Sequence, residues 1–195
     1  MYFLFTLTFL LLVGSCQPSP NLENSVHEKA FPVKDSSQTL SPKALPLFKT
    51  PEGQFAIYFP TPPQSSTQER EVDIGNLQMQ QWVSKDAAGQ YYVVSCADYP
   101  KAVLQLGSAQ ELLKGVKARL LSNLHAPQAT HQDITLDGLY NGIAFQAQAK
   151  RQHWYLNYHL YLVNNRLYQL GIHSALGPIP VQDSLDFFGS FEVVE

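Results

Sequence analysis

His153–His173 reads HWYLNYHLYLVNNRLYQLGIH, two runs of apolar and aromatic residues joined by Asn164-Asn165. Each run has the content of Leu, Val, Ile and Tyr that is typical of a β-strand. Asparagine tolerates a positive φ better than any residue except glycine, so the Asn pair favours a two-residue turn. The stretch therefore predicts a long β-hairpin.

The register of this hairpin follows from its turn: Tyr161 should lie opposite Tyr168, and His159 opposite Leu170. Because strand side chains alternate, the hairpin then has two faces. The first face carries Trp154, Leu156, Tyr158, Leu160, Leu162 and Leu167, and the second carries Tyr155, Tyr161, Val163, Tyr168, Leu170 and Ile172. Both faces are rich in large apolar side chains, so we expect both to be covered, as in the middle of a layered sandwich.

Four polar aromatic side chains share the second face: Tyr155, His159, Tyr161 and Tyr168. Such a group can form a binding surface, because each ring offers both contact area and a hydrogen-bonding group. The alternative is that a helix layer covers the group, and the apolar residues on the same face favour this second interpretation.

Further strands are predicted on both sides of the hairpin, where apolar or alternating runs end at turn residues. They are expected at Leu47–Lys49, Gln54–Phe59, Thr67–Ile74, Leu77–Ser84, Gln90–Asp98, His131–Leu136 and Ile143–Lys150, with an edge strand at Ser190–Val194. Gly75-Asn76 is the predicted turn between Thr67–Ile74 and Leu77–Ser84. In Ile143–Lys150, Gln146 and Gln148 face away from Phe145.

Two helices are predicted. Ser108–Leu124 has an apolar stripe at helical spacing, and Ser108 and Glu111 have the spacing of a capping box. Val181–Phe188 is expected to form a short helix that ends with Gly189 in the C-cap position. Strands, a helix, more strands and a last helix predict an α+β fold, an antiparallel β-sheet with helices packed on its faces.

The N-terminus predicts membrane attachment. Residues 1–15 are apolar and uncharged, and Val13-Gly14-Ser15-Cys16 resembles a bacterial lipobox, so we assign residues 1–15 as a lipoprotein signal peptide and Cys16 as the lipidation site. The apolar run is too short for a helix that spans a bilayer. No Lys or Arg precedes it, which departs from the usual positively charged start of a signal peptide. The expected location is the bacterial cell envelope, on a membrane and facing the periplasm or the cell exterior.

The mature chain is expected to have two parts. Residues 16–45 hold the lipidated Cys16 and then a linker rich in Pro, Ser, Asn and Gln, a composition typical of flexible segments. Residues 46–195 are long enough for one globular α+β domain with a core of normal size.

Charge and cysteine content exclude several classes of protein. The chain has 13 Lys and Arg against 16 Asp and Glu, a net charge of −3, which does not suit a nucleic-acid-binding protein. The two cysteines are Cys16 and Cys96, so acylation of the first leaves no intramolecular disulfide and no cysteine-based zinc site. Cys96 follows an apolar run, and we expect it to be buried rather than reactive.

No residue is predicted to be catalytic or to bind a metal or a cofactor. Glu69, Glu71 and Asp73 alternate along a strand and could hold a cation, but a solvated edge strand is the favoured interpretation. His153 and His159 share a face but lie about 20 Å apart along a strand, too far for one metal ion. The common nucleotide-binding, zinc-protease and nucleophile-elbow motifs are absent from the sequence.

The segments FKTPEGQFAIYFP, YYVVSCADYP, NNRLYQLGI and DFFGSF, which follow one another between Phe48 and Phe191, resemble a widespread uncharacterised bacterial envelope family. That family is similar to the PsbP-like sandwiches, which include photosystem-associated lumenal proteins, a Ran-binding nuclear protein and the periplasmic lipoprotein DcrB. The resemblance implies an α/β/α sandwich that acts as a binding or assembly module. Its motifs are turn glycines and core aromatics, so no functional residue carries over from it.

Two functions remain open. The first is a lipid-anchored binding or assembly module of the envelope, with the membrane and an unknown protein as partners and no nucleic acid. The second is an envelope hydrolase or metal-dependent enzyme whose active site is dispersed along the chain. We favour the first, because no nucleophile-base motif appears. A concave site with converging carboxylates and histidines would favour the second.

Overall fold

The computed structural model describes residues 46–52, 54–72, 75–105, 107–149 and 153–194. Cys16, the expected signal peptide and the expected linker lie outside the described residues. The elements, in chain order, are β1 (Leu47–Lys49), β2 (Phe55–Tyr58), β3 (Gln64–Val72), β4 (Gly75–Lys85), β5 (Tyr91–Asp98), α1 (Lys101–Leu104), α2 (Ala109–Asn123), β6 (Gln132–Leu136), β7 (Tyr140–Ala149), β8 (Trp154–Val163), β9 (Arg166–Ser174), α3 (Val181–Gly189) and β10 (Glu192–Val193).

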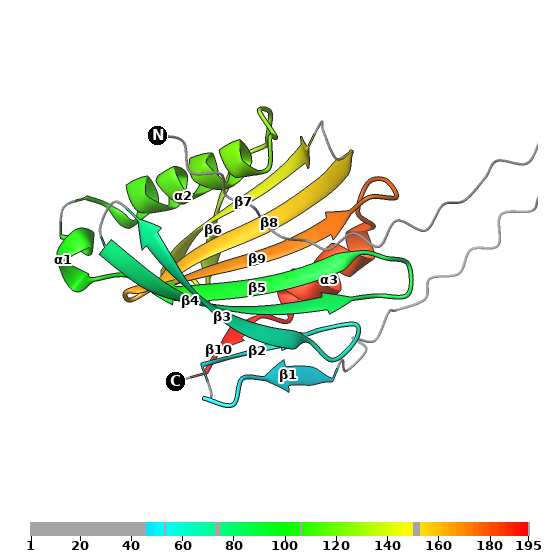
Figure 1. Cartoon of the computed structure of the whole chain (residues 1–195), viewed down its shortest axis with the longest axis horizontal. Coiled ribbons are helices and arrows are strands. Elements are labelled where there is room, and N and C mark those ends of the chain that lie inside the picture. Colours follow the sequence, from blue (N-terminus) through cyan, green and yellow to red (C-terminus); the bar gives the residue numbers. More distant parts are fainter. Residues whose placement is uncertain (1–45, 53, 73–74, 106, 150–152, 195) are drawn as a thin grey trace, which may run out of the picture. The chain divides into compact units, whose positions relative to one another are not determined.

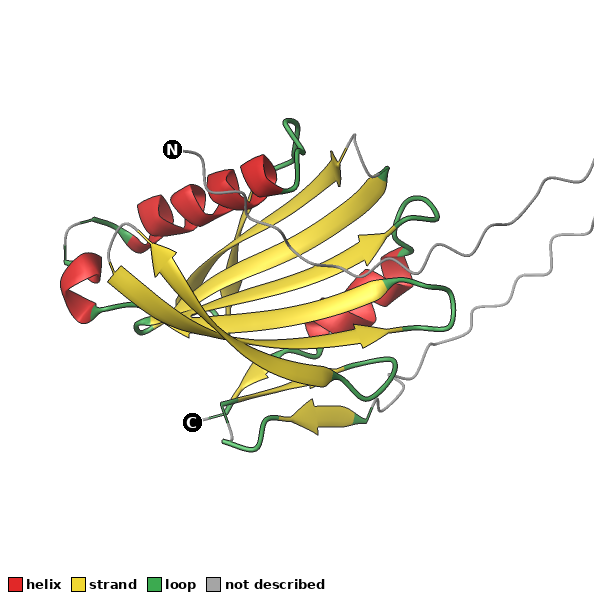
Figure 2. Ribbon diagram, viewed as in Figure 1, coloured by secondary structure: helices red, strands yellow, loops and turns green. Residues whose placement is uncertain are grey.

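The strands form two antiparallel sheets. The large sheet has seven strands in the order β3-β4-β5-β9-β8-β7-β6, and the small sheet has the order β1-β2-β10 (Figure 1). Helix α2 packs on one face of the large sheet, whereas α3 and the small sheet lie on the other (Figure 2). The predicted fold class, α+β with helices packed on the faces of an antiparallel sheet, is confirmed.

The central hairpin is β8 and β9, and its predicted register is confirmed. Tyr161 pairs with Tyr168, and His159 pairs with Leu170. Of the two turn residues, Asn164 has a φ of 55°, in the left-handed region, whereas Asn165 does not have a positive φ. Since β8 and β9 lie between β7 and β5, both edges of the hairpin are hydrogen-bonded within the sheet.

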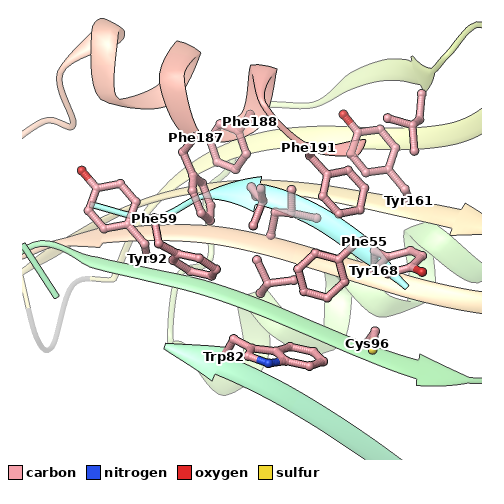
Figure 3. Packing of buried hydrophobic residues seen from close by; sticks show 14 of the residues in the cluster. Phe55, Phe59, Trp82, Tyr92, Cys96, Tyr161, Tyr168, Phe187, Phe188 and Phe191 are labelled. Carbon is pink, nitrogen blue, oxygen red and sulfur yellow. The ribbon is translucent and has the colours of Figure 1, made fainter. Parts of the chain in front are cut away.

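One face of the hairpin belongs to an aromatic core beneath α3 and β2. Phe187 of α3 and Phe55 of β2 are completely buried, and the Phe55 ring makes an edge contact with Trp82 at a centroid distance of 4.9 Å (Figure 3). Tyr161 and Tyr168 belong to this core, with 5% and 2% of their surface exposed. These two residues are therefore covered, and the binding-surface alternative is wrong for them. The expected helix layer is only part of the cover, because their rings contact Phe55 of β2 and Phe191, which follows α3.

The other face of the hairpin packs against α2 through a second, mostly aliphatic core. Leu113 of α2 is completely buried in it, together with Ile143 of β7 and Leu160 of β8. The predicted capping box is present: the Ser108 Oγ accepts a hydrogen bond from the Glu111 backbone N–H, and the Glu111 carboxylate accepts one from the Ser108 N–H. The helix therefore begins where the sequence predicts it.

Two strand glycines make room for rings on the neighbouring strand. Gly142 pairs with Tyr161, and a Cβ at Gly142 would lie 2.6 Å from the tyrosine Cδ1. Gly171 pairs with Tyr158, and a Cβ there would lie 2.8 Å from that ring's Cε1. Each glycine thus lets a large aromatic side chain lie flat over its backbone.

Two local predictions are wrong. Gly75 and Asn76 are not a turn but belong to β4, where they pair with Val72 and Glu71; this longer ladder gains backbone hydrogen bonds and leaves residues 73–74, which the structure does not describe, as the connection. Gly189 is the last residue of α3, and Ser190 is the C-cap. The expected C-terminal edge strand is present as β10, which pairs with β2 in the small sheet.

Candidate functional site

A hollow of about 430 Å³ lies open to solvent on the α3 side of the large sheet. Three stretches of chain and one loop residue form it. Its lining consists of Gln128, Ala129 and Thr130 before β6, Gln146, Ala147 and Gln148 of β7, Tyr155, Leu156 and Asn157 of β8, and Pro178 before α3. The volume is at the small end of the range that is typical of small-molecule sites.

Four side chains on β7 and β8, which we call the floor, line the sheet side of the hollow, and the two glutamines among them are exposed to solvent. Gln146 pairs with Asn157, and Gln148 pairs with Tyr155. Residues two apart on a strand share a face, and directly opposed residues have Cβ atoms about 5 Å apart, so the four groups form one compact array. The Asn157 amide donates a hydrogen bond to the Ser184 Oγ of α3 at 2.9 Å. Within the described part of the chain, the side chains of Gln146, Gln148 and Tyr155 make no hydrogen bond.

Thr130 forms the outer wall of the hollow, and three hydrogen bonds fix its position. Its backbone N–H donates to the Gln146 carbonyl at 2.9 Å, and its hydroxyl accepts from the Gln146 N–H at 2.7 Å. Its carbonyl accepts a hydrogen bond from Lys117 Nζ of α2 at 2.7 Å. Helix α2, on the far face of the sheet, therefore helps to fix the wall of a hollow that opens on the near face.

Lys117 also begins a chain of polar contacts on the surface. Its Nζ lies 3.3 Å from His131 Nδ1, and His131 Nε2 lies 3.0 Å from the Asp133 carboxylate. Both His131 and Asp133 are exposed, and the chain runs along the outside of the wall rather than into the hollow. Its evident role is to hold the segment before β6 against α2.

The lining of the hollow is neutral and polar. Amides, a hydroxyl and a phenol supply hydrogen-bond donors and acceptors, while Pro178 supplies apolar contact; the side chains of Leu156 and Ala129 pack into the core on the α2 side. None of the ten lining residues is a carboxylate, an imidazole, a thiol or a cation. This set of groups can bind a ligand by hydrogen bonds and ring contacts, but it offers no nucleophile with an adjacent base.

Tyr155 is the one member of the predicted aromatic group that reaches the hollow, where it is half-buried. His159, four residues further along β8, is instead stacked on Phe188 of α3, with ring centroids 4.0 Å apart and ring planes 14° apart. Its Nδ1 lies 3.1 Å from the Tyr161 hydroxyl. Burial lowers the pKa of His159 to about 4, so this histidine is neutral at physiological pH.

His173 occupies the opposite face of the hairpin. Its Nε2 lies 2.6 Å from the Tyr158 hydroxyl, and the Trp154 ring makes an edge contact with it at 5.9 Å. Burial lowers the pKa of His173 to about 4 as well. Both His159 and His173 are therefore packed as neutral rings.

These two histidines should make the protein sensitive to mild acid. Since their folded-state pKa of about 4 lies below the unfolded value of 6.5, the unfolded chain binds more protons between these pH values. The stabilisation is complete above pH 6.5 and is lost as the pH falls towards 4, by up to about 3 kcal/mol for each histidine. Urea unfolding between pH 4 and pH 7.5 measures this loss.

The matched variants for this measurement are His159→Phe and His125→Asn. His159→Phe keeps a ring against Phe188 but does not titrate, so the acid loss should become smaller. His125 is exposed and has a φ of 50°, which Asn tolerates, so His125→Asn serves as a control for replacing a surface histidine. A wild-type unfolding free energy that is flat between pH 4 and pH 7 would contradict the prediction.

The remaining candidates from the sequence lie outside the hollow. Glu69 is exposed on β3 and accepts a hydrogen bond from the Asn76 amide at 3.0 Å, while the Glu71 side chain and Asp73 lie outside the described residues. Cys96 is buried as predicted, and burial raises the pKa of its thiol to about 11. His153 is exposed in the turn immediately before β8. Among the described residues, no three of His, Cys, Asp and Glu are grouped as metal ligands.

A polar cluster that the sequence did not suggest joins the β4–β5 turn to α3. The buried Gln90 amide donates hydrogen bonds to Asp183 of α3 at 2.7 Å and to Asp86 at 3.2 Å. The Gln90 Oε1 is buried and has no hydrogen-bond partner in the described part of the chain. Since the amide nitrogen lies between the two carboxylates, the cluster fixes the first turn of α3 rather than forming a cation site.

No protein-family model matches the chain, and no curated protein matches it in sequence. No helix in the described ranges is both long enough and apolar enough to cross a membrane. The fold and the site thus define the class of the molecule by themselves: an α+β sandwich with a neutral, hydrogen-bonding hollow beside its C-terminal helix.

Proposed function

We propose that this protein is a lipid-anchored binding or assembly module of the bacterial cell envelope, and that the hollow is its binding site. One observation carries the binding role: Gln146, Gln148 and Tyr155 line the hollow together, and none of their side chains has a hydrogen-bond partner among the described residues. The two glutamines are exposed and Tyr155 is half-buried, so all three groups are open to a ligand that enters from solvent.

The proposed anchor is the lipid on Cys16, and its support is the lipobox-like quartet in the sequence. The linker that follows would let the domain reach a partner at some distance from the membrane. The resemblance to envelope sandwiches such as DcrB points in the same direction. The alternative function, a hydrolase or metal-dependent enzyme, has no observation of comparable weight, because the lining residues are amides, small apolar residues, a hydroxyl and a phenol.

Cys16→Ser tests the anchor. In cells that are fed labelled palmitate, the wild-type chain should carry the label and fractionate with membranes, because the Cys16 thiol is the proposed acceptor of the lipid. The variant should carry no label and leave the membrane fraction. Cys96→Ser is the matched control, since the Cys96 side chain is buried, and it should remain labelled. A Cys16→Ser chain that is still acylated would overturn the proposed anchor.

Ligand-induced stabilisation tests the hollow. A ligand that binds only the folded chain at 100 times its Kd raises the free energy of unfolding by about 2.7 kcal/mol. Envelope-derived saccharides, peptides and lipids are added in turn to the wild-type chain and to Gln148→Ala. The proposal expects at least one ligand that stabilises the wild type and fails to stabilise the variant. A ligand that stabilises both equally binds elsewhere, and the hollow would then lose its assigned role.

A further inference from the structure

We propose that the hollow binds a neutral saccharide, an inference that rests on the proposed role of the hollow as the binding site. None of the lining residues is ionised at neutral pH, and the floor offers amide and phenol groups only. A phosphate or carboxylate ligand would lose hydration on entering without gaining an Arg or Lys partner, which is unfavourable.

The floor can both donate hydrogen bonds to ligand hydroxyl groups and accept hydrogen bonds from them. Each amide of Gln146 and Gln148 offers two donors and a carbonyl acceptor, and a sugar hydroxyl offers one donor and two acceptor lone pairs. The two glutamines are two residues apart on β7 and therefore project side by side. A ligand that carries hydroxyls on adjacent carbons can satisfy both amides at once.

Tyr155 adds a ring beside the amides. It is half-buried and lies directly across from Gln148, with its hydroxyl free of protein partners in the described part of the chain. Pro178 lines the hollow as well. The Tyr155 ring and Pro178 suit the C–H groups of a sugar ring, while the phenol and the amides suit its hydroxyls.

An extended peptide fits this place less well. Peptides commonly bind to sheets by adding a strand to an open edge. Here the outer edge of β7 is already occupied: the Thr130 N–H donates to the Gln146 carbonyl, Ala129 forms a bridge with Ala147, and β6 pairs with the first half of the strand. Only the side-chain face of β7 and β8 remains accessible at this place. A ligand there would bind to side-chain amides, as sugar hydroxyls can, and not to an open strand edge.

The test is a titration of the full chain in detergent, followed by NMR of the glutamine side-chain amides. The neutral probes are maltotriose and the N-acetylglucosamine trimer. The comparison probes are a galacturonic acid trimer, which is charged, and trialanine, which is a peptide. We expect at least one neutral probe to shift the amide signals of Gln146 and Gln148. Neither comparison probe should do so.

Two double variants make the test specific. Gln146→Ala/Gln148→Ala removes both amides and should weaken binding of the neutral probe by about tenfold or more, as expected for the loss of two hydrogen bonds. Gln81→Ala/Gln169→Ala is the matched control, because these half-buried glutamines lie on the α2 side of the sheet. The control should bind as the wild type does.

The outcomes separate the two proposals. If the charged trimer or trialanine shifts the hollow amides and the neutral probes do not, the ligand class is wrong while the binding role of the hollow stands. If a neutral saccharide binds equally well to Gln146→Ala/Gln148→Ala, the assignment of the saccharide to this site is overturned. If none of the four probes shifts the hollow amides, the saccharide proposal fails. The ligand screen with Gln148→Ala then decides whether the hollow is a binding site.

Discussion

Phe55→Ala is expected to lower the free energy of unfolding by about 4 kcal/mol, as for other large aromatic residues in well-packed cores. Phe55 is completely buried between the small sheet and the large one. Its ring lies 4.9 Å from that of Trp82, 6.0 Å from that of Tyr168 and 5.9 Å from that of Phe191, measured between centroids. Truncation therefore removes contacts to β4, to β9 and to the segment after α3 at once (Figure 3).

Urea unfolding of the wild-type and variant chains measures this loss. The matched control is Leu185→Ala on α3, where the leucine is 61% exposed, and its effect should stay within about 0.5 kcal/mol. A Phe55→Ala chain that unfolds at the wild-type midpoint would mean that the small sheet does not depend on this ring. Other residues of the aromatic core would then have to hold the two sheets together.

Gly142→Ala is expected to destabilise the chain by about 2–3 kcal/mol, because overpacking a filled site forces strain on its neighbours. The added Cβ would lie 2.6 Å from Tyr161 Cδ1 and 2.8 Å from the Leu160 carbonyl oxygen. The carbonyl belongs to the paired strand β8 and cannot move without breaking the ladder. The Tyr161 ring is also confined, since it stacks on Phe191 with ring planes 7° apart.

Gly115→Ala is also a glycine-to-alanine change, but we expect it to raise the free energy of unfolding rather than lower it. Gly115 lies in the middle of α2, and a Cβ there would meet nothing within 4 Å. Alanine should therefore stabilise the helix by about 0.5–1 kcal/mol. Equal effects of the two substitutions would show that glycine content, and not the close approach of Tyr161 to Gly142, governs the result.

The central hairpin shows how much of the fold is encoded locally. Its register follows from the Asn164-Asn165 turn, and its two apolar faces follow from the period of two, so the amino-acid sequence alone predicts both. Helix α2 is a similar case, because the Ser108–Glu111 box and the apolar stripe are signals within one turn or a few turns of chain. The predicted turn at Gly75-Asn76 is wrong because several neighbouring residues could serve as a turn, and the number of ladder pairs decides between them.

Local sequence patterns do not predict how the strands divide into two sheets. Phe55, Ala56 and Ile57 of β2 are buried like the residues of a central strand, so their pattern does not reveal which sheet they join. Their partners are β1, immediately before in sequence, and β10, more than a hundred residues later. The arrangement buries Phe55 and Phe191 in the aromatic core that the small sheet shares with the large one.

The candidate site is determined by tertiary structure in the same way. The sequence shows that Gln146 and Gln148 face away from the apolar side of β7, and that Tyr155 and Tyr161 share a face. Periodicity identifies a face, but it does not say what covers that face. Tyr161 is buried under Phe191, whereas Tyr155 remains beside an open hollow, because the chain around α3 covers one end of β8 and leaves the other open. That difference depends on contacts between residues far apart in the chain, which no local pattern records.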